Sequence, residues 1–235
     1  MAILRSALTD GASGSNITTG DAGDPTPFVG VTTTGGTLTR DQTPGTSVLP
    51  MFMKMVNNSN ANCVAYWTTA TTNQAALHFY YYATSFAERV AVASLGTASP
   101  SYYLGIEVDS VPAGRVYVTN NAGTALFTSS TNLSTSTLYR FEASLDNTAA
   151  AGSHIINLNV YLANSTSPIS GLTYSTTTAS TGTSSLVRAN FGRYTRSTTA
   201  STYWLGDLAS RDGGTTEIGQ YGSAFTWTKT ITIGG

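Results

Sequence analysis

The chain has 235 residues, of which only 10% are charged, with 11 Lys and Arg, 12 Asp and Glu, and a net charge of −1. Average soluble proteins carry about 25% charged residues, and no basic run is present that would neutralise nucleic-acid phosphates. The single cysteine excludes an internal disulfide, and no apolar run is long enough for a membrane helix. We therefore expect neither a nucleic-acid partner nor membrane insertion.

The composition favours an all-β protein. Hydrophobic residues make up 40% and aromatic residues 10% of the chain, which supplies enough apolar surface for a core. Ser and Thr account for 68 residues; Thr favours strands because it is β-branched, and Ser favours turns. One domain of antiparallel strands joined by uncharged loops is the simplest interpretation.

The chain divides by composition into three parts. Residues 1–47 are rich in Gly, Thr, Asp and Pro and hold the turn pairs Asp10-Gly11, Gly35-Gly36 and Pro44-Gly45. We expect them to form an N-terminal arm and edge strands packed on the body. A β-sandwich is expected over residues 48–221, and a tail or added strand over residues 222–235. Residues 1–15 lack the apolar run of a signal peptide.

Alternating apolar and polar residues predict most of the strands. The expected strands span residues 48–56, 63–67, 75–82, 88–92, 102–108, 115–119, 124–127, 138–145, 155–162, 186–194 and 202–211. A turn rich in Asn and Ser is expected before residue 63, and a long Ser/Thr connection over residues 164–185. Residues 75–82 have the Ala content of a short helix, but their aromatic cluster favours a strand.

Several short motifs occur in an order that is typical of one protein family. They are DGASGSNITT at residues 10–19, GGTLT at 35–39, GRVYV at 114–118, TLYRFE at 137–142 and YWLGDLA at 203–209. On these residues the chain resembles the concanavalin A-like (laminin-G-like) jelly-roll domains of virion proteins of tailed bacteriophages, especially those of actinobacteria. The closing strand of that family usually carries paired aspartates. Here Gly206 stands in place of the first, which argues against a cation site.

The resemblance implies an antiparallel jelly-roll sandwich and a non-enzymatic structural protein of the phage particle. We expect a capsid decoration or minor capsid protein, assembled in the host cytoplasm and exposed on the virion surface. Its implied partners are the major capsid protein or other virion subunits, and a homo-oligomer such as a trimer. A surface with few charges suits such contacts, because few ions must be desolvated. The alternatives are an adhesin that recognises host surface glycans and, third, a glycoside hydrolase.

Four aromatic residues are candidates for stacking on sugar rings, although strand aromatics more often pack in a core. They are Tyr66, Trp67, Tyr81 and Tyr103. Glu107 and Asp109 alternate along a strand and so share one face, as the acids of jelly-roll glucanases do. The second glutamate of that motif is missing, so we expect a strand end and no catalytic pair.

The remaining candidate residues favour structural roles. The two histidines, His78 and His154, are too few for a three-imidazole metal site, and no Gly-x-Ser-x-Gly motif accompanies them. Cys63 lies in an apolar strand and is expected to be buried. Loop aspartates that could bind calcium lack EF-hand spacing; they are Asp21, Asp24 and Asp41. We therefore expect no catalytic residue, no metal and no cofactor.

Overall fold

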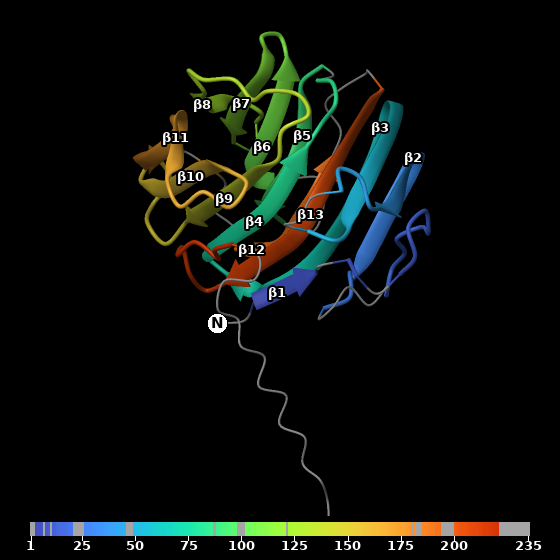
Figure 1. The fold of residues 1–235 in the computed structure, drawn as a ribbon. Coiled ribbons are helices and arrows are strands. Elements are labelled where there is room, and N and C mark those ends of the chain that lie inside the picture. The colour runs from blue at the N-terminus through green and yellow to red at the C-terminus, as the bar shows by residue number, and fades with distance from the viewer. Residues whose placement is uncertain are drawn as a thin grey trace, which may run out of the picture.

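The computed structural model describes residues 3–6, 8–9, 11–20, 26–45, 49–86, 88–97, 102–120, 122–179, 181, 185–193 and 200–220. All the secondary-structure elements assigned within these residues are β-strands, as the composition predicts (Figure 1). The described part of the chain holds no helix that is long and apolar enough to cross a membrane. The strands are β1 (Ile3–Ser6), β2 (Gly30–Asp41), β3 (Phe52–Thr72), β4 (Gln74–Tyr82), β5 (Val90–Gly96), β6 (Tyr102–Ser110), β7 (Ala113–Thr119), β8 (Ala125–Thr128), β9 (Tyr139–Asp146), β10 (His154–Leu162), β11 (Pro168–Ala179), β12 (Leu186–Arg193) and β13 (Ser201–Asp212).

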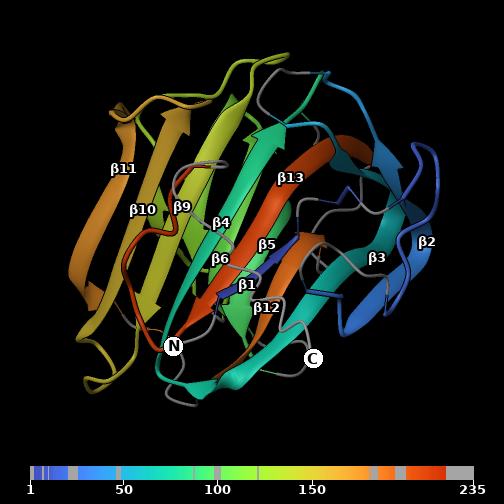
Figure 2. The ribbon, with the colours of Figure 1, turned by 60° about the horizontal axis from the view of Figure 1, so that its bottom comes forward.

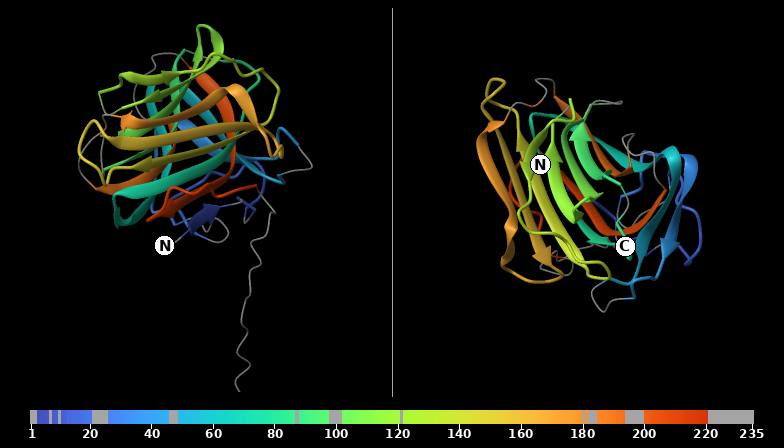
Figure 3. Two further views of the ribbon diagram at one scale, coloured as in Figure 1. Left: turned by 90° about the vertical axis from the view of Figure 1, so that its left-hand side faces the viewer. Right: turned by 90° about the horizontal axis from the view of Figure 1, so that it is seen from above.

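The strands pair antiparallel along one path, β11-β10-β9-β4-β13-β3-β12-β5-β6-β7-β8, with β1 beside β13 and β2 beside β3. The long strand β3 takes part in both halves, because residues 53–57 pair with β13 and residues 63–72 pair with β12. The path thus folds back at β3 into a jelly-roll sandwich whose strands curve around a shared interior (Figures 2 and 3). The first layer is β11, β10, β9, β4, β13 and β1, and the second layer is β12, β5, β6, β7 and β8.

Two glycines let β2 follow the bend of β3 from one layer to the other. The register of the β2–β3 pair shifts between Thr34 and Gly36, and Gly35 has a φ of 81°. A Cβ atom on Gly36 would lie 2.6 Å from the backbone oxygen of Val56. The Gly35-Gly36 pair, expected to be a turn, is therefore a bend within a strand that larger residues would not fit.

Aromatic side chains from both layers fill the interior. Phe79 on β4 stacks on Phe141 of β9 with ring centroids 4.9 Å apart, and its edge meets Phe191 of the second layer at 6.3 Å. Trp67 of β3 packs between Phe28 and Phe191, at 5.0 and 5.4 Å. All five side chains are buried, so these contacts join the two layers through apolar burial.

Most outward positions of β9, β10 and β11 carry polar side chains, and they recur at every second residue because successive side chains of a strand point to opposite faces. The pairing register places Ser144, Asn157 and Ser175 in one row across β9, β10 and β11. The next row holds His78, Glu142 and Asn159 across β4, β9 and β10. This polar face positions the candidate site.

Two sequence-based expectations differ from the structure. The Ser/Thr connection over residues 164–185 contains strand β11, whose inward side chains include Leu172 and Tyr174. Few inward residues gave little apolar periodicity, so the strand was not evident in the sequence. The turn expected before residue 63 is absent, because β3 continues through it as the bend between layers. The expected tail over residues 222–235 lies outside the described residues.

Candidate functional site

A β-bulge in β13 interrupts the outer face of the first layer. The register with β4 shifts between Gly206 and Ala209, and Asp207 within the bulge has a φ of 44°. A left-handed backbone is uncommon for a residue with a Cβ, although Asp and Asn tolerate it better than most. The bulge directs the fully buried Asp207 carboxylate toward His78 and Arg5.

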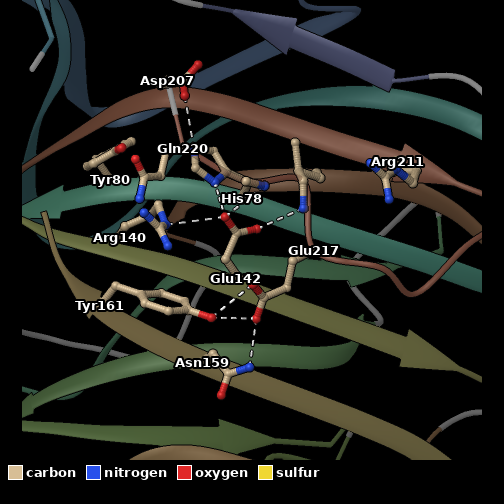
Figure 4. Close-up of polar contacts among 12 residues, drawn as sticks. His78, Tyr80, Arg140, Glu142, Asn159, Tyr161, Asp207, Arg211, Glu217 and Gln220 are labelled. Carbon is tan, nitrogen blue, oxygen red and sulfur yellow. Dashed lines mark hydrogen bonds and ion pairs between the residues drawn. The ribbon is translucent and has the colours of Figure 1, made fainter. Parts of the chain in front are cut away.

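Four buried charged side chains form a continuous chain across β1, β13, β4 and β9. Arg5 donates from Nε to Asp207 Oδ1 at 2.6 Å and also contacts Oδ2 through Nη2. Asp207 Oδ2 lies 3.0 Å from His78 Nε2, and Glu142 Oε1 lies 2.7 Å from His78 Nδ1 (Figure 4). The imidazole is therefore held between two carboxylates at a position with no exposed surface.

These contacts determine the protonation states of His78 and Asp207. Burial by itself lowers the pKa of His78, but the Glu142 charge and the hydrogen bonds to both carboxylates outweigh it and raise the pKa to about 9. Burial raises the pKa of Asp207, yet the bonds from His78 and Arg5 hold it below its ordinary value. At neutral pH His78 is an imidazolium that donates both N–H groups, so its nitrogens do not ligate a metal or accept a proton.

Residues 213–220, the return segment, cross back over the first layer after β13 and lie in front of β9 as the red stretch of Figure 2. Their path begins where the Gly213 backbone N–H donates to the Gln74 oxygen at 2.8 Å. The backbone N–H groups of Ile218 and Gly219 each donate to the Glu142 carboxylate at 3.1 Å. The return segment thereby covers Glu142, which is 2% exposed.

The side chains of the return segment divide the outer face into two halves. Ile218 packs on Ala76 and Ala209 and seals the half that contains His78. On the other half, Glu217 Oε1 accepts a hydrogen bond from Asn159 Nδ2 at 2.7 Å.

A tyrosine also binds the exposed Glu217 carboxylate. The Tyr161 hydroxyl lies 2.8 and 2.9 Å from the two Glu217 carboxylate oxygens. Burial, followed by the hydrogen bond to Glu217 and its charge, raises the pKa of Tyr161 to about 12. The hydroxyl therefore stays protonated and donates to Glu217 at neutral pH.

A pocket of about 160 Å³ lies on the half that carries Glu217, between the sheet and the return segment. Its polar lining residues are Glu142, Ser144, Asn157, Asn159, Thr215 and Glu217. A ladder of neutral hydrogen bonds leads toward it from β11, because Ser175 Oγ donates to Asn157 Oδ1 at 2.8 Å and Asn157 Nδ2 donates to Ser144 Oγ at 3.2 Å. The pocket thus combines two carboxylates with neutral donors and acceptors, the groups that bind sugar hydroxyls.

The four aromatic residues expected from the sequence lie outside this pocket. Trp67 is fully buried and donates from Nε1 to the Pro27 oxygen at 3.0 Å. Tyr81 is 3% exposed, and burial raises its pKa. Neither ring presents a face on which a sugar could stack, because both are packed in the core. Tyr66, half-buried on the second layer, and Tyr103, which is 6% exposed, stay predictions.

The acids and the second histidine singled out in the sequence have local partners. Glu107 accepts a hydrogen bond from Thr119 at 3.0 Å, and Asp109 accepts one from the backbone N–H of Val111 at 3.1 Å. His154 Nδ1 lies 2.6 Å from Thr181 Oγ1. Among the residues that the structure describes, no group of three or more His, Cys, Asp or Glu side chains is arranged to hold a metal ion.

The remaining polar candidates divide between described and undescribed residues. Cys63 is buried, which raises the pKa of its thiol to about 12, and its Sγ lies 3.3 Å from the Thr37 oxygen. Asp41 accepts a hydrogen bond from Trp204 Nε1 at 3.2 Å. Asp21 and Asp24 lie outside the described residues.

The charged residues of the site were not recognised in the sequence as one group. Arg140, Glu142 and Ser144 are visible there as one polar face of a strand, but nothing local shows what lies opposite them. Glu142 and Ile218 are 76 residues apart in the chain. Only the fold brings the return segment onto that face.

Comparison with known proteins gives the fold a wider context. No family model matches the sequence, and no curated protein matches it either. Among solved structures, the chain is similar to an alginate lyase from a Chlorella virus, with a TM-score of 0.58 and 11% identity over 86% of this chain and 100% of that chain. It is also similar to the cellulose-induced protein Cip1, with a TM-score of 0.60 and 16% identity over 93% of this chain and 100% of that chain.

These likenesses confirm the all-β jelly-roll fold, and they correct one expectation. The exclusion of enzymatic activity rested on the fold resemblance and on the missing glucanase motif. It is wrong, because the same fold forms an entire alginate lyase. The identities of 11% and 16% bear on the fold alone, and neither structure connects the chain with a phage particle. The chain is thus a jelly-roll β-sandwich whose architecture is similar to that of the viral alginate lyase and of Cip1.

Proposed function

We propose that this chain is a carbohydrate-active protein that binds a neutral saccharide in the pocket of the first layer. The observation that carries the proposal is the lining of that pocket. Two carboxylates and four neutral hydrogen-bonding side chains line a single concave site on a jelly-roll sheet. Sugar hydroxyls both donate and accept hydrogen bonds, so they are complementary to such a mixed set.

The charges around the pocket favour a neutral ligand over an acidic one. Glu142 and Glu217 both line it, and a uronate would bring a third carboxylate close to them. The nearest cations already have partners: His78 lies between Glu142 and Asp207, and the Arg140 guanidinium lies over the Tyr161 ring at 4.0 Å. The substrate of the structurally similar alginate lyase is therefore not transferred to this pocket.

Two carboxylates in one pocket also support hydrolysis as the reaction. Glycosidic bond cleavage requires one carboxyl group to protonate the leaving oxygen and another to act as base or nucleophile. Glu142 accepts hydrogen bonds from His78 and from two backbone N–H groups. Glu217 is exposed and reaches the pocket from the return segment. Both residues are candidate catalytic groups of the proposed reaction.

Calorimetric titration with neutral oligosaccharides and with oligouronates of equal length tests the proposal. We expect the neutral ligands alone to bind at this pocket, and Asn159→Ala to weaken that binding about tenfold because one hydrogen bond is lost. Asp109→Asn is the matched control on the second layer and should leave it unchanged. Release of reducing ends from a neutral polysaccharide, abolished by Glu217→Gln, would establish hydrolysis. If no neutral saccharide binds, or if Asn159→Ala has no effect, the proposal fails.

The place of action that we propose is the surface of a tailed-phage particle. It is supported by the residues that resemble phage virion domains and by a surface with few charges, and its partners would be the major capsid protein or other virion subunits. A homo-oligomer such as a trimer and recognition of host glycans belong to the same proposal. Adding the purified chain to particles that lack it, followed by sedimentation, tests this placement; particles that do not retain the chain contradict it.

A further inference from the structure

The outer face of the second layer carries a row of short side chains that crosses six strands. Register pairs connect the row from β2 through β3, β12, β5 and β6 to β7. Its members in that order are Gly30, Tyr66, Asn190, Ser94, Gly105 and Thr119. The side chains between Tyr66 and Thr119 are short, and those of Asn190, Ser94 and Thr119 are buried.

An arginine stacked on a tyrosine forms the first end of the row. The Tyr66 ring lies over Gly30, where an added Cβ atom would come within 2.2 Å of it. The guanidinium of Arg188 lies 3.9 Å from the centre of the same ring. Both side chains are partly exposed. Arg188 has no acidic partner within the described ranges, so its charge is available to a ligand.

Two further arginines lie on the same face, away from the row itself: Arg89 is beside Glu107, and Arg115 is opposite Asp109. Arg89 donates from Nε to Glu107 at 2.5 Å, and its guanidinium lies 4.0 Å from the centre of the Tyr117 ring. The Arg89 Nη2 and Arg115 Nε atoms are shielded from solvent and have no hydrogen-bond partner in the described part of the chain. Glu107 therefore neutralises one arginine and leaves donors of both without a partner.

The middle of the row holds an incomplete hydrogen-bonding group. Asn190 is 5% exposed, and its Nδ2 donates to Ser94 Oγ at 3.2 Å. Asn190 Oδ1 has no hydrogen-bond partner among the residues that the structure describes. Buried amide oxygens are nearly always paired, so an unpaired one in an outward row indicates a missing donor. A ligand hydroxyl lying along the row would supply it.

We propose that this row is a second binding site, separate from the pocket of the first layer, and that it takes an anionic glycan. Carboxylate or sulfate groups would pair with Arg188 at one end of the row and with Arg89 and Arg115 on the same face, and hydroxyls would meet Asn190 between them. The chain has only 11 lysines and arginines, and three of them lie on this face beside the acids Glu107 and Asp109, so these five side chains leave one net positive charge for a ligand.

The same geometry favours a glycan over a single-stranded nucleic acid. Nucleic-acid grooves of this size rely on aromatic rings on which bases stack. Here guanidinium groups lie over Tyr66 and Tyr117. The guanidinium groups cover the ring faces on which bases would stack. Arginine instead pairs with acidic groups such as carboxylates.

Calorimetric titration of the full chain with an oligogalacturonate and with a neutral oligogalactoside of equal length tests the proposal. We expect the oligogalacturonate to bind, with an affinity that falls as salt is added. Arg188→Gln should weaken this binding about tenfold, because a charge-assisted hydrogen bond is lost. Arg211→Gln on the first layer is the matched control and should leave it unchanged. Neutral-saccharide binding at the first-layer pocket should be the same in the Arg188→Gln variant.

Several outcomes would overturn the proposal. These are no binding of the oligogalacturonate, an equal loss in the Arg188→Gln and Arg211→Gln variants, and equal affinity for a single-stranded oligonucleotide. Thermal unfolding checks that the variants are folded. If Arg188→Gln is not folded, Arg115→Gln takes its place with the same expected loss, and wild-type affinity in that variant would contradict the site.

Discussion

The outer faces of the two layers differ in whether their charged side chains have partners within the protein. On the first layer, Arg5, Asp207, His78 and Glu142 form a chain whose members satisfy one another, and the return segment covers it. On the second layer, arginine donors and the amide oxygen of Asn190 lack partners in the described part of the chain. Both faces arise from the same alternation of inward apolar and outward polar residues.

The comparison shows that burial has different consequences on the two faces. A buried charge must be paired, because an isolated one is strongly destabilising. The four charged side chains of the first layer meet this requirement among themselves and so contribute to stability. Arg140 Nε on the same face has no hydrogen-bond partner among the described residues, although it lies 3.4 Å from Glu142 Oε1. The second layer leaves part of the requirement to a ligand. Substitutions in the chain Arg5–Asp207–His78–Glu142 should accordingly affect stability, whereas substitutions of the second-layer arginines should affect binding.

The largest expected effect is the loss of the carboxylate that two cations share. Asp207→Asn keeps the side-chain shape and the tolerance for a positive φ, but it leaves Arg5 and His78 without their common anion. We expect the free energy of unfolding to fall by about 3–5 kcal/mol, the usual result of breaking a buried ion pair. Urea denaturation measures this value. Asp109→Asn on the second layer is the control, with an expected change within about 0.5 kcal/mol; equal losses would contradict the comparison.

The pH dependence of the free energy of unfolding should reveal the ion pairs that His78 makes with Asp207 and Glu142. The pKa of His78 is about 9 in the folded protein, against the ordinary histidine value of 6.5, so the folded state binds the proton more tightly. This contribution, on the order of 3 kcal/mol, is fully present below pH 6.5 and is lost as the pH rises through about 9. Denaturation at a series of pH values measures the slope. A His78→Gln variant should lack this slope, and an unchanged slope would refute the assignment.

Truncation of a side chain in the return segment should have a smaller effect on the free energy of unfolding. Ile218→Ala deletes the side chain that packs on Ala76 and Ala209, and we expect a loss of about 2 kcal/mol. The backbone bonds to Glu142 can persist, so the chain of charges should remain. Hydrogen exchange at the Ile218 and Gly219 amides is the readout, and faster exchange is expected. Unaltered exchange rates would mean that the side chain does not hold the return segment in place.

The smallest effect on stability is expected on the second layer. Arg188 stacks on Tyr66 and has no acidic partner among the described residues, so Arg188→Gln should change the free energy of unfolding by no more than about 0.5 kcal/mol. The thermal midpoint should therefore stay near that of the original chain. A fall as large as that of Asp207→Asn would show that both faces depend on their charges for stability, and the contrast between them would disappear.

Most strands could be predicted because their two faces differ in polarity. The expected range 155–162 corresponds to β10, and the range 202–211 corresponds to β13. Strand β11 could not be found, because its outward Ser and Thr residues resemble those of a loop. Within β4 the inward aromatic residues could not be told from the outward ones: every residue from 77 to 82 is His, aromatic or Leu, so polarity does not separate the inward Tyr81 from the outward Tyr80.

The candidate site was less accessible to prediction than the fold. His78 was visible as one histidine in an aromatic strand, and its two acidic partners lie 64 and 129 residues away in the chain. No local spacing connects such residues, because their contact depends on strand order. The bulge at Asp207 adds a second obstacle, since a regular strand would direct that side chain differently.

The order of the strands also constrains how the molecule can be made. The last two strands, β12 and β13, lie in the middle of the path, between β3 and β5 and between β4 and β3. During synthesis, the positions of β12 and β13 in the two layers therefore stay unfilled until residue 212 has left the ribosome. Fragments that end before β12 contain the outer strands without the central ones. The two layers should thus form only after β13 has been synthesised, and the fold should not tolerate the loss of β13 residues.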